Sequence, residues 1–305
     1  MKIITDISDL KLKNSAVTIG KFDGVHLGHQ SLLRAMGSHE DASRVLFTFD
    51  RAPEEFFGDV NRKYITTEDE KREICRRLGV DIYISIPVTE DFLSMPPQDF
   101  LREILFKRLG AVKIVTGENF RFGRDRAGDN AMIAAFSKEA GCAAVEVKKE
   151  RAGGDVISTS RIKKLIESGD VSAAERLLGH PYVMTGRTSR GKRIGASMGL
   201  PTANIYPPKK KLLPRFGVYK SVLVTEDGSS HPAITNVGVN PTVNGADERI
   251  VRAETHIPGF EGDLYGKKIE VRFLSFVRPE KKFRNTGELR AQIESDIKAA
   301  GLNVK

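Results

Sequence analysis

The chain has 305 residues, of which 40% are hydrophobic and 29% charged, and it carries a formal net charge of +9. This length exceeds what one hydrophobic core usually fills, and the composition is that of an ordinary folded protein, so we expect two domains. No run approaches the roughly 18 apolar residues of a membrane helix, so no membrane partner is expected. The positive charge favours anionic partners, but the chain lacks tryptophan and any basic stretch rich in aromatic residues, so nucleic acid is not expected among them.

The start of the chain and its cysteines bear on location. The first ten residues contain no basic region followed by an apolar one, so no secretory signal is expected. Cys75 and Cys142 are too few and too isolated for a disulfide framework or a zinc site. A reducing, cytoplasmic setting is therefore the expectation.

The first half of the chain alternates between strand and helix patterns. Strands are expected at residues 16–20, 44–49, 81–87 and 111–117, and helices at 26–36, 67–79 and 97–110. The strand segments are short, continuous apolar runs, which is typical of parallel strands buried on both faces. The alternation predicts an α/β fold with a doubly wound, Rossmann-like parallel sheet.

Three polar loops, each marked by glycine or proline, directly follow expected strands. They are residues 21–29, 50–56 and 118–128. Ligands of open parallel sheets bind beyond the carboxyl ends of the strands, and right-handed crossovers bring those ends to one rim. The three loops are therefore expected to face a shared cleft.

The first of these loops contains two histidines, His26 and His29, at the expected start of a helix. Free N–H groups at a helix start favour phosphate, and Gly24 and Gly28 allow its close approach. Two imidazoles on one helix face could donate hydrogen bonds to oxygens whose charge grows as a phosphate bond breaks. Ordinary structural histidines and half of a metal site are the alternatives.

Two further segments carry weaker signals. Residues 118–129 combine aromatics, glycines and arginines, which suits phosphate or carboxylate binding but equally suits a solvated surface loop. Ser158, Thr159 and Ser160 stand where a helix begins, which is ordinary N-capping unless Arg161 beside them reaches a polyphosphate.

The second half has a different pattern, after two short helices within residues 157–181. Strands are expected at 217–225, 231–239, 249–257 and 267–277, and an amphipathic helix at 285–301. Turn clusters between the strands indicate an antiparallel barrel or sandwich, of which the β-barrel is favoured. The predicted domains are residues 1–182 and 183–305.

Two motifs of the second half stay ambiguous on spacing alone. "GLPTANI" (199–205) is typical of a turn that enters a strand. Glu254 and His256 lie on one side of an expected strand, because side chains alternate, and a solvent-facing carboxylate is the plain interpretation of Glu254.

The motifs together carry a resemblance. "TIGKFDGVHLGHQSLL", "IVTGENFRFGRDRAGD", "ISTSRIKKLIESGDVSAAERLLGHPY", "GLPTANI" and "GVYKSVLV" resemble, in order, the bifunctional bacterial riboflavin kinase/FAD synthetase family. The resemblance runs from about residue 16 to the C-terminus. It implies an N-terminal nucleotidyltransferase that joins FMN to the adenylyl group of ATP, and a C-terminal kinase that makes FMN from riboflavin.

The resemblance also implies roles for individual residues. His26 and His29 would stabilise charge on the reacting α-phosphate, and Glu254 would be the general base of the kinase. Thr202 and Asn204 would hold Mg²⁺, a hard ion that prefers such oxygen ligands. The implied ATP- or phosphate-binding residues are Gly20, Phe22, Asp23, Gly24, Gly28, Asn119, Ser158, Thr159, Ser160, Arg161, Thr202 and Asn204.

The sequence departs from the family pattern in several places. Ala52 stands where the family commonly has a histidine, and Arg51 beside it is the residue that could substitute. Loss of one such donor can cost about 2–4 kcal/mol of transition-state stabilisation, so a weakened adenylyl transfer is expected. Smaller departures are the Ser-Thr-Ser order at 158–160, Ala196 before the "GLPTANI" motif, and Gly259.

The expected function is Mg²⁺-dependent conversion of riboflavin to FMN and of FMN to FAD, with riboflavin, FMN and ATP as substrates. The alternatives are a kinase with a weakened first domain, a nucleotidyltransferase acting on another phosphorylated alcohol, and a flavin- or nucleotide-binding regulator without turnover. The sequence gives no indication of oligomeric state.

Overall fold

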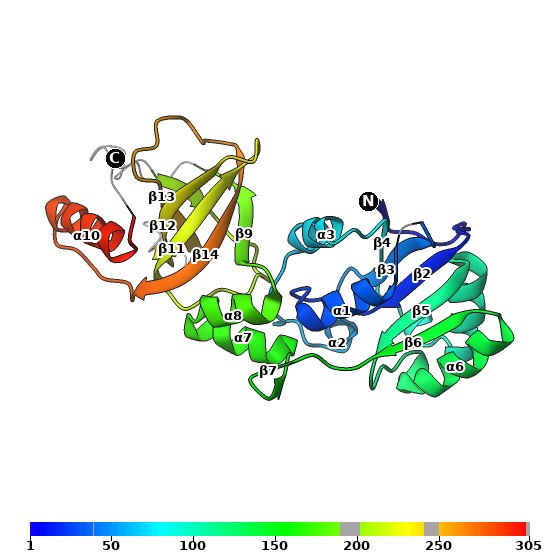
Figure 1. Cartoon of the computed structure of the whole chain (residues 1–305). Helices are drawn as coiled ribbons and strands as arrows, with labels where there is room; N and C mark the ends of the chain where they lie inside the picture. The colour runs from blue at the N-terminus through cyan, green and yellow to red at the C-terminus, as the bar shows by residue number, and fades with distance from the viewer. Residues whose placement is uncertain (39, 190–201, 241–249, 303–305) are drawn as a thin grey trace. The chain divides into compact units, whose positions relative to one another are not determined.

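The computed structural model describes residues 1–38, 40–189, 202–240 and 250–302 (Figure 1). Its internal contacts divide the chain into two compact units, Met1–Thr159 and Ser160–Lys305. The first helix pair of the second half thereby falls in the second unit. The domain limits 1–182 and 183–305 stay a prediction. No helix among the described residues is long and apolar enough to cross a membrane.

Within the described residues, the sheet of the first unit has six parallel strands in the order β1-β4-β3-β2-β5-β6. The strands are β1 (Lys2–Ile4), β2 (Ser15–Ile19), β3 (Ser43–Phe49), β4 (Ile82–Ile86), β5 (Ala111–Gly117) and β6 (Ala143–Val147). The strand order reverses at β2 and β5, which is the switch point where doubly wound sheets bind their ligands. The predicted doubly wound parallel fold is confirmed.

The first unit buries a core on each face of this sheet. One face packs α1 (Leu27–Ala35) and α3 (Glu68–Arg77) through residues such as Leu33 and Cys75, and the other packs η1 (Phe100–Arg108) and α6 (Asn130–Glu139). The remaining helical segments are α2 (Pro53–Phe56), α4 (Glu90–Leu93), α5 (Pro97–Asp99) and η2 (Arg124–Arg126), and a hairpin joins β7 (Arg151–Ala152) to β8 (Asp155–Val156).

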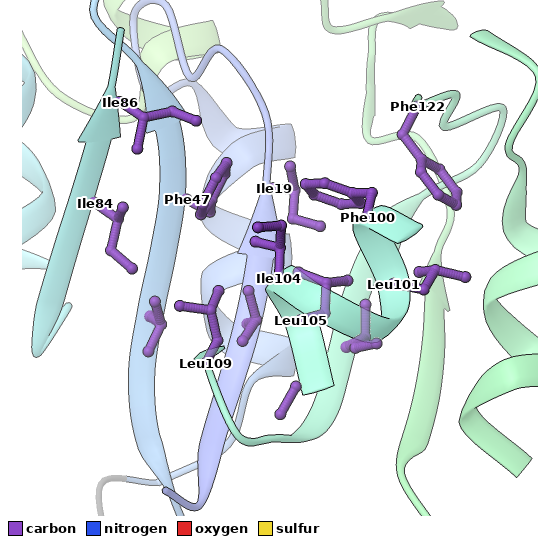
Figure 2. Close-up of a cluster of buried hydrophobic side chains, with 14 of the residues drawn as sticks. Ile19, Phe47, Ile84, Ile86, Phe100, Leu101, Ile104, Leu105, Leu109 and Phe122 are labelled. Atoms are coloured by element: carbon purple, nitrogen blue, oxygen red, sulfur yellow. The ribbon is translucent and has the colours of Figure 1, made fainter. Parts of the chain in front are cut away.

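The helix predicted at residues 97–110 has two parts, α5 and the π-helical η1. The Leu109 amide donates to the carbonyl of Ile104, five residues back, at 2.9 Å. The wider turn still places Phe100, Leu101, Ile104, Leu105 and Leu109 against the sheet, in one buried cluster with Phe47 and Ile84 (Figure 2). The apolar spacing thus predicted the buried face correctly, although not the helix type.

In the described part of the second unit, six antiparallel strands form one curled sheet in the order β10-β13-β12-β11-β14-β9. They are β9 (Tyr182–Arg187), β10 (Thr202–Ile205), β11 (Gly217–Thr225), β12 (Ser230–Asn240), β13 (Ile250–His256) and β14 (Lys268–Arg278). A bridge between Ser189 and Asn204 draws the two edges of the sheet together. The prediction of an antiparallel barrel architecture is confirmed.

Among the described residues of the second unit, three helices accompany this sheet. They are α7 (Thr159–Ser168), α8 (Val171–Leu178) and the predicted C-terminal helix, α10 (Thr286–Ala299). Gly179 ends α8 in the left-handed region (φ 75°), which suits glycine. Ile297 of α10 packs on Val218 and Ile234, and the buried Asp296 carboxylate accepts two hydrogen bonds of 2.7 Å from the Arg278 guanidinium. This ion pair ties α10 to the end of β14.

Candidate active sites

The first candidate site lies in the loop between β2 and α1. His26 is the N-cap of α1, and its Nδ1 accepts a hydrogen bond from the His29 backbone N–H at 3.4 Å. The two imidazoles stack with a centroid distance of 3.8 Å and an interplanar angle of 18°, and the Phe22 ring lies 4.7 Å from that of His29. The structure therefore brings the predicted histidine pair together at the carboxyl end of β2.

The hydrogen bond at His26 and the burial of His29 bear on where the protons of the two imidazoles lie. Since Nδ1 of His26 accepts a hydrogen bond, the proton of the neutral ring is on Nε2. Burial, followed by the charges of His26 and Lys71, lowers the pKa of His29 well below its ordinary value. Two neutral rings can each offer one N–H to a phosphate oxygen.

Asp23 and Gly24 connect the histidine loop to the segment before α3. Asp23 Oδ1 accepts hydrogen bonds from the amides of Ile65 (2.8 Å) and Thr66 (3.3 Å), and the Gly24 amide donates to Thr66 Oγ1 at 3.2 Å. Gly24 has a φ of 81°, a left-handed backbone conformation that residues with a side chain rarely adopt. These contacts fix the course of the loop, and the predicted contact of both residues with phosphate stays a prediction.

Two other glycines of the loop leave room for aromatic rings. A Cβ on Gly28 would stand 3.2 Å from the His26 imidazole, and one on Gly20 would stand 3.2 Å from the Phe22 ring. Such contacts are tighter than ordinary van der Waals packing, so a larger residue at either position would displace the ring beside it.

The other predicted phosphate-binding residues occupy two separate segments. Asn119 follows β5, the neighbour of β2 at the switch point, and adopts a left-handed conformation with φ 62°. It thus stands at the same edge of the sheet as the histidine loop. Ser158 immediately precedes α7, and residues 159–161 form the first turn of that helix. The predicted helix start is confirmed, whereas phosphate binding there stays a prediction.

Ala52 is buried at the start of α2, with an exposed fraction of 2%. Its amide donates a 2.8 Å hydrogen bond to the Tyr64 hydroxyl. Arg51 donates to the carbonyl of Val88 at 3.0 Å and lies over the Phe56 ring, 5.7 Å from its centroid. Arg51 is therefore engaged within its own surroundings, which does not favour its use as a substitute for histidine.

For the FMN adenylylation that the resemblance implies, we expect Ala52→His to raise the rate by about tenfold, because an imidazole would supply the missing hydrogen-bond donor. The measurement is the kcat of FAD formation from FMN and ATP. Ala52→Leu is the matched control, since it adds comparable bulk without a donor and should give no gain. Equal rates in both variants would show that the position does not serve the reaction.

The second candidate site lies on β13 and its edge neighbour β10. The Glu254 carboxylate accepts a hydrogen bond from Thr202 Oγ1 at Oε1 (2.9 Å) and one from Arg252 Nη2 at Oε2 (2.7 Å). Asn204 pairs directly with Glu254 across the two strands, and Asn236 pairs with it from β12. The side chain of Glu254 keeps an exposed fraction of 29%, so its carboxylate is accessible from solvent.

Thr202 and Asn204 have the donor chemistry that Mg²⁺ requires. Asn204 is buried, and its Oδ1 has no hydrogen-bond partner among the described residues. The Thr202 hydroxyl donates a hydrogen bond to Glu254, so the lone pairs of the hydroxyl oxygen remain available to a metal ion. No group of three His, Cys, Asp or Glu side chains in the described residues could hold a metal, which separates this oxygen pair from a transition-metal site.

Several residues that the sequence brought into consideration are outside the described part of the chain. They are Ala196 and residues 199–201 of the "GLPTANI" motif. Conversely, sequence reasoning missed Arg252 and Lys71. Arg252 could have been found, because it precedes Glu254 by two on one strand and so shares its face. Lys71 gave no such signal, since only the packing of α3 brings its ammonium to the carbonyl of Lys21 in the histidine loop.

Comparison with known proteins gives matches over both halves of the chain. The FAD synthetase family matches residues 8–161, and the riboflavin kinase family matches residues 178–302. The bifunctional riboflavin kinase/FMN adenylyltransferase of Escherichia coli strain K12 is 31% identical, over 97% of this chain and 96% of that protein. The protein of the same description from Pseudomonas fluorescens is 30% identical, over 98% of this chain and 97% of the relative.

The fold has a full-length counterpart among solved structures. A Streptococcus pneumoniae crystal structure described as a macrolide-efflux protein has a TM-score of 0.84 and 26% identity, and the match covers 98% of each chain. The two family matches define two classes of protein, a nucleotidyltransferase in the first half and a small-molecule kinase in the second. The chain belongs to the bifunctional riboflavin kinase/FMN adenylyltransferase family. The predicted resemblance is confirmed.

Proposed function

We propose that this chain makes FAD in two steps, each of which uses one ATP. The second unit transfers the γ-phosphoryl group of ATP to riboflavin and releases ADP. The first unit transfers the adenylyl group of a second ATP to FMN and releases pyrophosphate. The observation that carries the proposal is the carboxylate of Glu254, held by Thr202 and Arg252 next to the buried amide of Asn204.

In the kinase reaction, Glu254 accepts the proton of the ribityl 5′-hydroxyl as that oxygen attacks the γ-phosphorus. The bond from the γ-phosphorus to the bridging oxygen breaks, and ADP leaves. The hydrogen bonds from Thr202 and Arg252 fix the direction of the carboxylate toward the hydroxyl. Thr202 and Asn204 would hold Mg²⁺, which would neutralise charge on the phosphates.

In the adenylyl transfer, a phosphate oxygen of FMN attacks the α-phosphorus of ATP directly, so no covalent enzyme intermediate forms. The bond from the α-phosphorus to the bridging oxygen breaks, and pyrophosphate leaves. His26 and His29 donate hydrogen bonds to α-phosphate oxygens as their charge grows. Gly20, Phe22, Gly28, Asn119 and the segment 158–161 serve ATP binding in this proposal.

We also propose a cytoplasmic location and the domain limits 1–182 and 183–305. The location is supported by two cysteines without a disulfide, the buried Cys75 and the partly buried Cys142, and by the need for ATP. The proposed partners are the small-molecule substrates alone.

The test is to incubate the purified chain with riboflavin, ATP and Mg²⁺ and to separate the flavins by chromatography. We expect FMN first and FAD afterwards. FMN without FAD would leave only the kinase, consistent with the loss of a donor at Ala52. Tight flavin binding without conversion would indicate a flavin-binding regulator without turnover. FAD made only from added FMN would refute the proposed kinase activity.

A further inference from the structure

A carboxylate in the connection that follows β6 bonds to the helix of the histidine pair. Glu150 lies three residues beyond the end of β6 and is partly buried. Its Oε1 accepts a 2.5 Å hydrogen bond from the hydroxyl of Ser31, a residue of α1 with an exposed fraction of 9%. The Ser31 oxygen in turn accepts a 2.7 Å hydrogen bond from Arg34 Nη2. The carboxylate is thus fixed to α1 two residues after His29.

The backbone of Glu150 closes the hairpin that comes next in the chain. Its carbonyl oxygen accepts a 2.9 Å hydrogen bond from the amide of the buried Ile157. Between these two residues lies the hairpin of β7 and β8, in which Arg151 pairs with Val156. Ser158, a predicted phosphate-binding residue, directly follows Ile157. Glu150 therefore closes the hairpin with its backbone and attaches the closed hairpin to α1 with its side chain.

A second, weaker tie joins the same connection to the loop after β5. The Lys149 amide donates to Glu118 Oε1 at 3.4 Å, and the Glu118 amide donates to the carbonyl of Val147 at 3.0 Å. The bond from Lys149 is exposed to solvent, whereas the bond between Ser31 and Glu150 is shorter and partly buried. A short hydrogen bond to a carboxylate, screened from water, is the stronger of the two. The Ser31–Glu150 bond is therefore the main attachment of this connection.

We propose that Glu150 is a positioning residue of the adenylyl-transfer site, which holds residues 158–159 where they bind the phosphates of ATP. The inference rests on the proposed function of the first unit. The histidine pair begins the same helix that carries Ser31, so the bond to Glu150 fixes residues 158–159 relative to the two imidazoles. Without the bond, ATP must order this segment when it binds, which weakens its binding. The transfer step, which the histidines serve, keeps its rate.

The test separates KM from kcat for FAD formation from FMN and ATP by the full chain. Ser31→Ala and Glu150→Ala each remove one partner of the bond, and Glu150→Gln keeps an acceptor for the Ser31 hydroxyl. Glu146→Ala is the matched control, because Glu146 of β6 also accepts a hydrogen bond (2.8 Å) from a neutral side chain on a helix, Asn130 of α6. Hydrogen exchange of the Ile157 amide, measured without substrates, reports on the hairpin.

We expect Ser31→Ala and Glu150→Ala each to raise KM for ATP about tenfold, with kcat within about threefold of the wild type, and to speed the exchange of Ile157. The double variant should be no worse than either single variant, because both changes remove the same bond. Glu150→Gln should keep most of the affinity, and Glu146→Ala should match the wild type. KM for ATP in the kinase reaction should stay constant throughout.

An unchanged KM for ATP in Ser31→Ala, an equal rise in Glu146→Ala, or additive effects in the double variant would overturn the proposal. Faster exchange of Ile157 with wild-type KM would show that the bond only stabilises the hairpin. Ser31→Ala answers the question if Glu150→Ala fails to fold, because alanine suits the interior of a helix. If the wild type makes no FAD, the proposed function of the first unit fails, and the exchange of Ile157 still decides whether Glu150 holds this segment.

Discussion

Glu254→Gln is expected to lower the kcat of FMN formation by about a thousandfold, with riboflavin binding retained. Glutamine can still accept the hydrogen bond from Thr202, but it cannot take the proton of the ribityl hydroxyl. The measurement is the rate of FMN formation at saturating riboflavin and ATP. FAD formation from added FMN should be unchanged, and the retained riboflavin binding shows that the second unit, which carries Glu254, is folded.

Glu270→Gln is the matched control for this prediction. Glu270 on β14 accepts a 2.7 Å hydrogen bond from Arg272, two residues along the strand, as Glu254 does from Arg252. It therefore tests the loss of an arginine-paired strand carboxylate outside the proposed site. Glu270→Gln should retain the wild-type rate. A Glu254→Gln variant that turns over like the wild type would refute the assignment of the general base.

His26→Asn is expected to lower the kcat of FAD formation by about a hundredfold to a thousandfold. Asparagine is among the best N-cap residues, so α1 should keep its start and the protein its stability. The change therefore separates the imidazole from the cap that His26 also provides. The measurements are FAD formation from FMN and ATP and the midpoint of urea unfolding.

The kinase reaction of the same preparation serves as the internal control, because Glu254 belongs to the other compact unit. His26→Asn should leave the conversion of riboflavin to FMN unaltered. FAD formation within about threefold of the wild-type rate would show that the imidazole only caps the helix.

The periodicity of the sequence predicted most of the architecture, and the misses have physical causes. β1 has three residues, too few to show a pattern, and β6 (Ala143–Val147) is an edge strand that is largely exposed. An edge strand needs no continuous apolar run, so its sequence lacks the signal that revealed β2 and β3. The π-helical turn of η1 likewise depends on packing, which spacing alone does not encode.

The two candidate sites differed in how far the sequence could predict them. His26 and His29 are three positions apart at the start of one helix, so their spacing in the sequence was sufficient to predict that they lie together. Thr202 and Glu254 are 52 positions apart, so spacing in the sequence could not predict their contact. Only the family resemblance assigned them to one site. The hydrogen bond from the Ile65 amide to Asp23 likewise joins residues 42 positions apart. The sequence pattern therefore did not indicate that Lys71 of α3 lies near the histidine loop.

The pairing of Asn204 with Glu254 limits where members of this family can gain or lose residues. One residue inserted within β13 before Glu254 would turn the carboxylate to the opposite face of the sheet, away from Thr202 and Asn204. Insertions in connections between strands carry no such penalty, because they leave the alternation within each strand intact. Relatives that keep the kinase reaction should therefore vary in loop length while the spacing inside β10 and β13 stays constant.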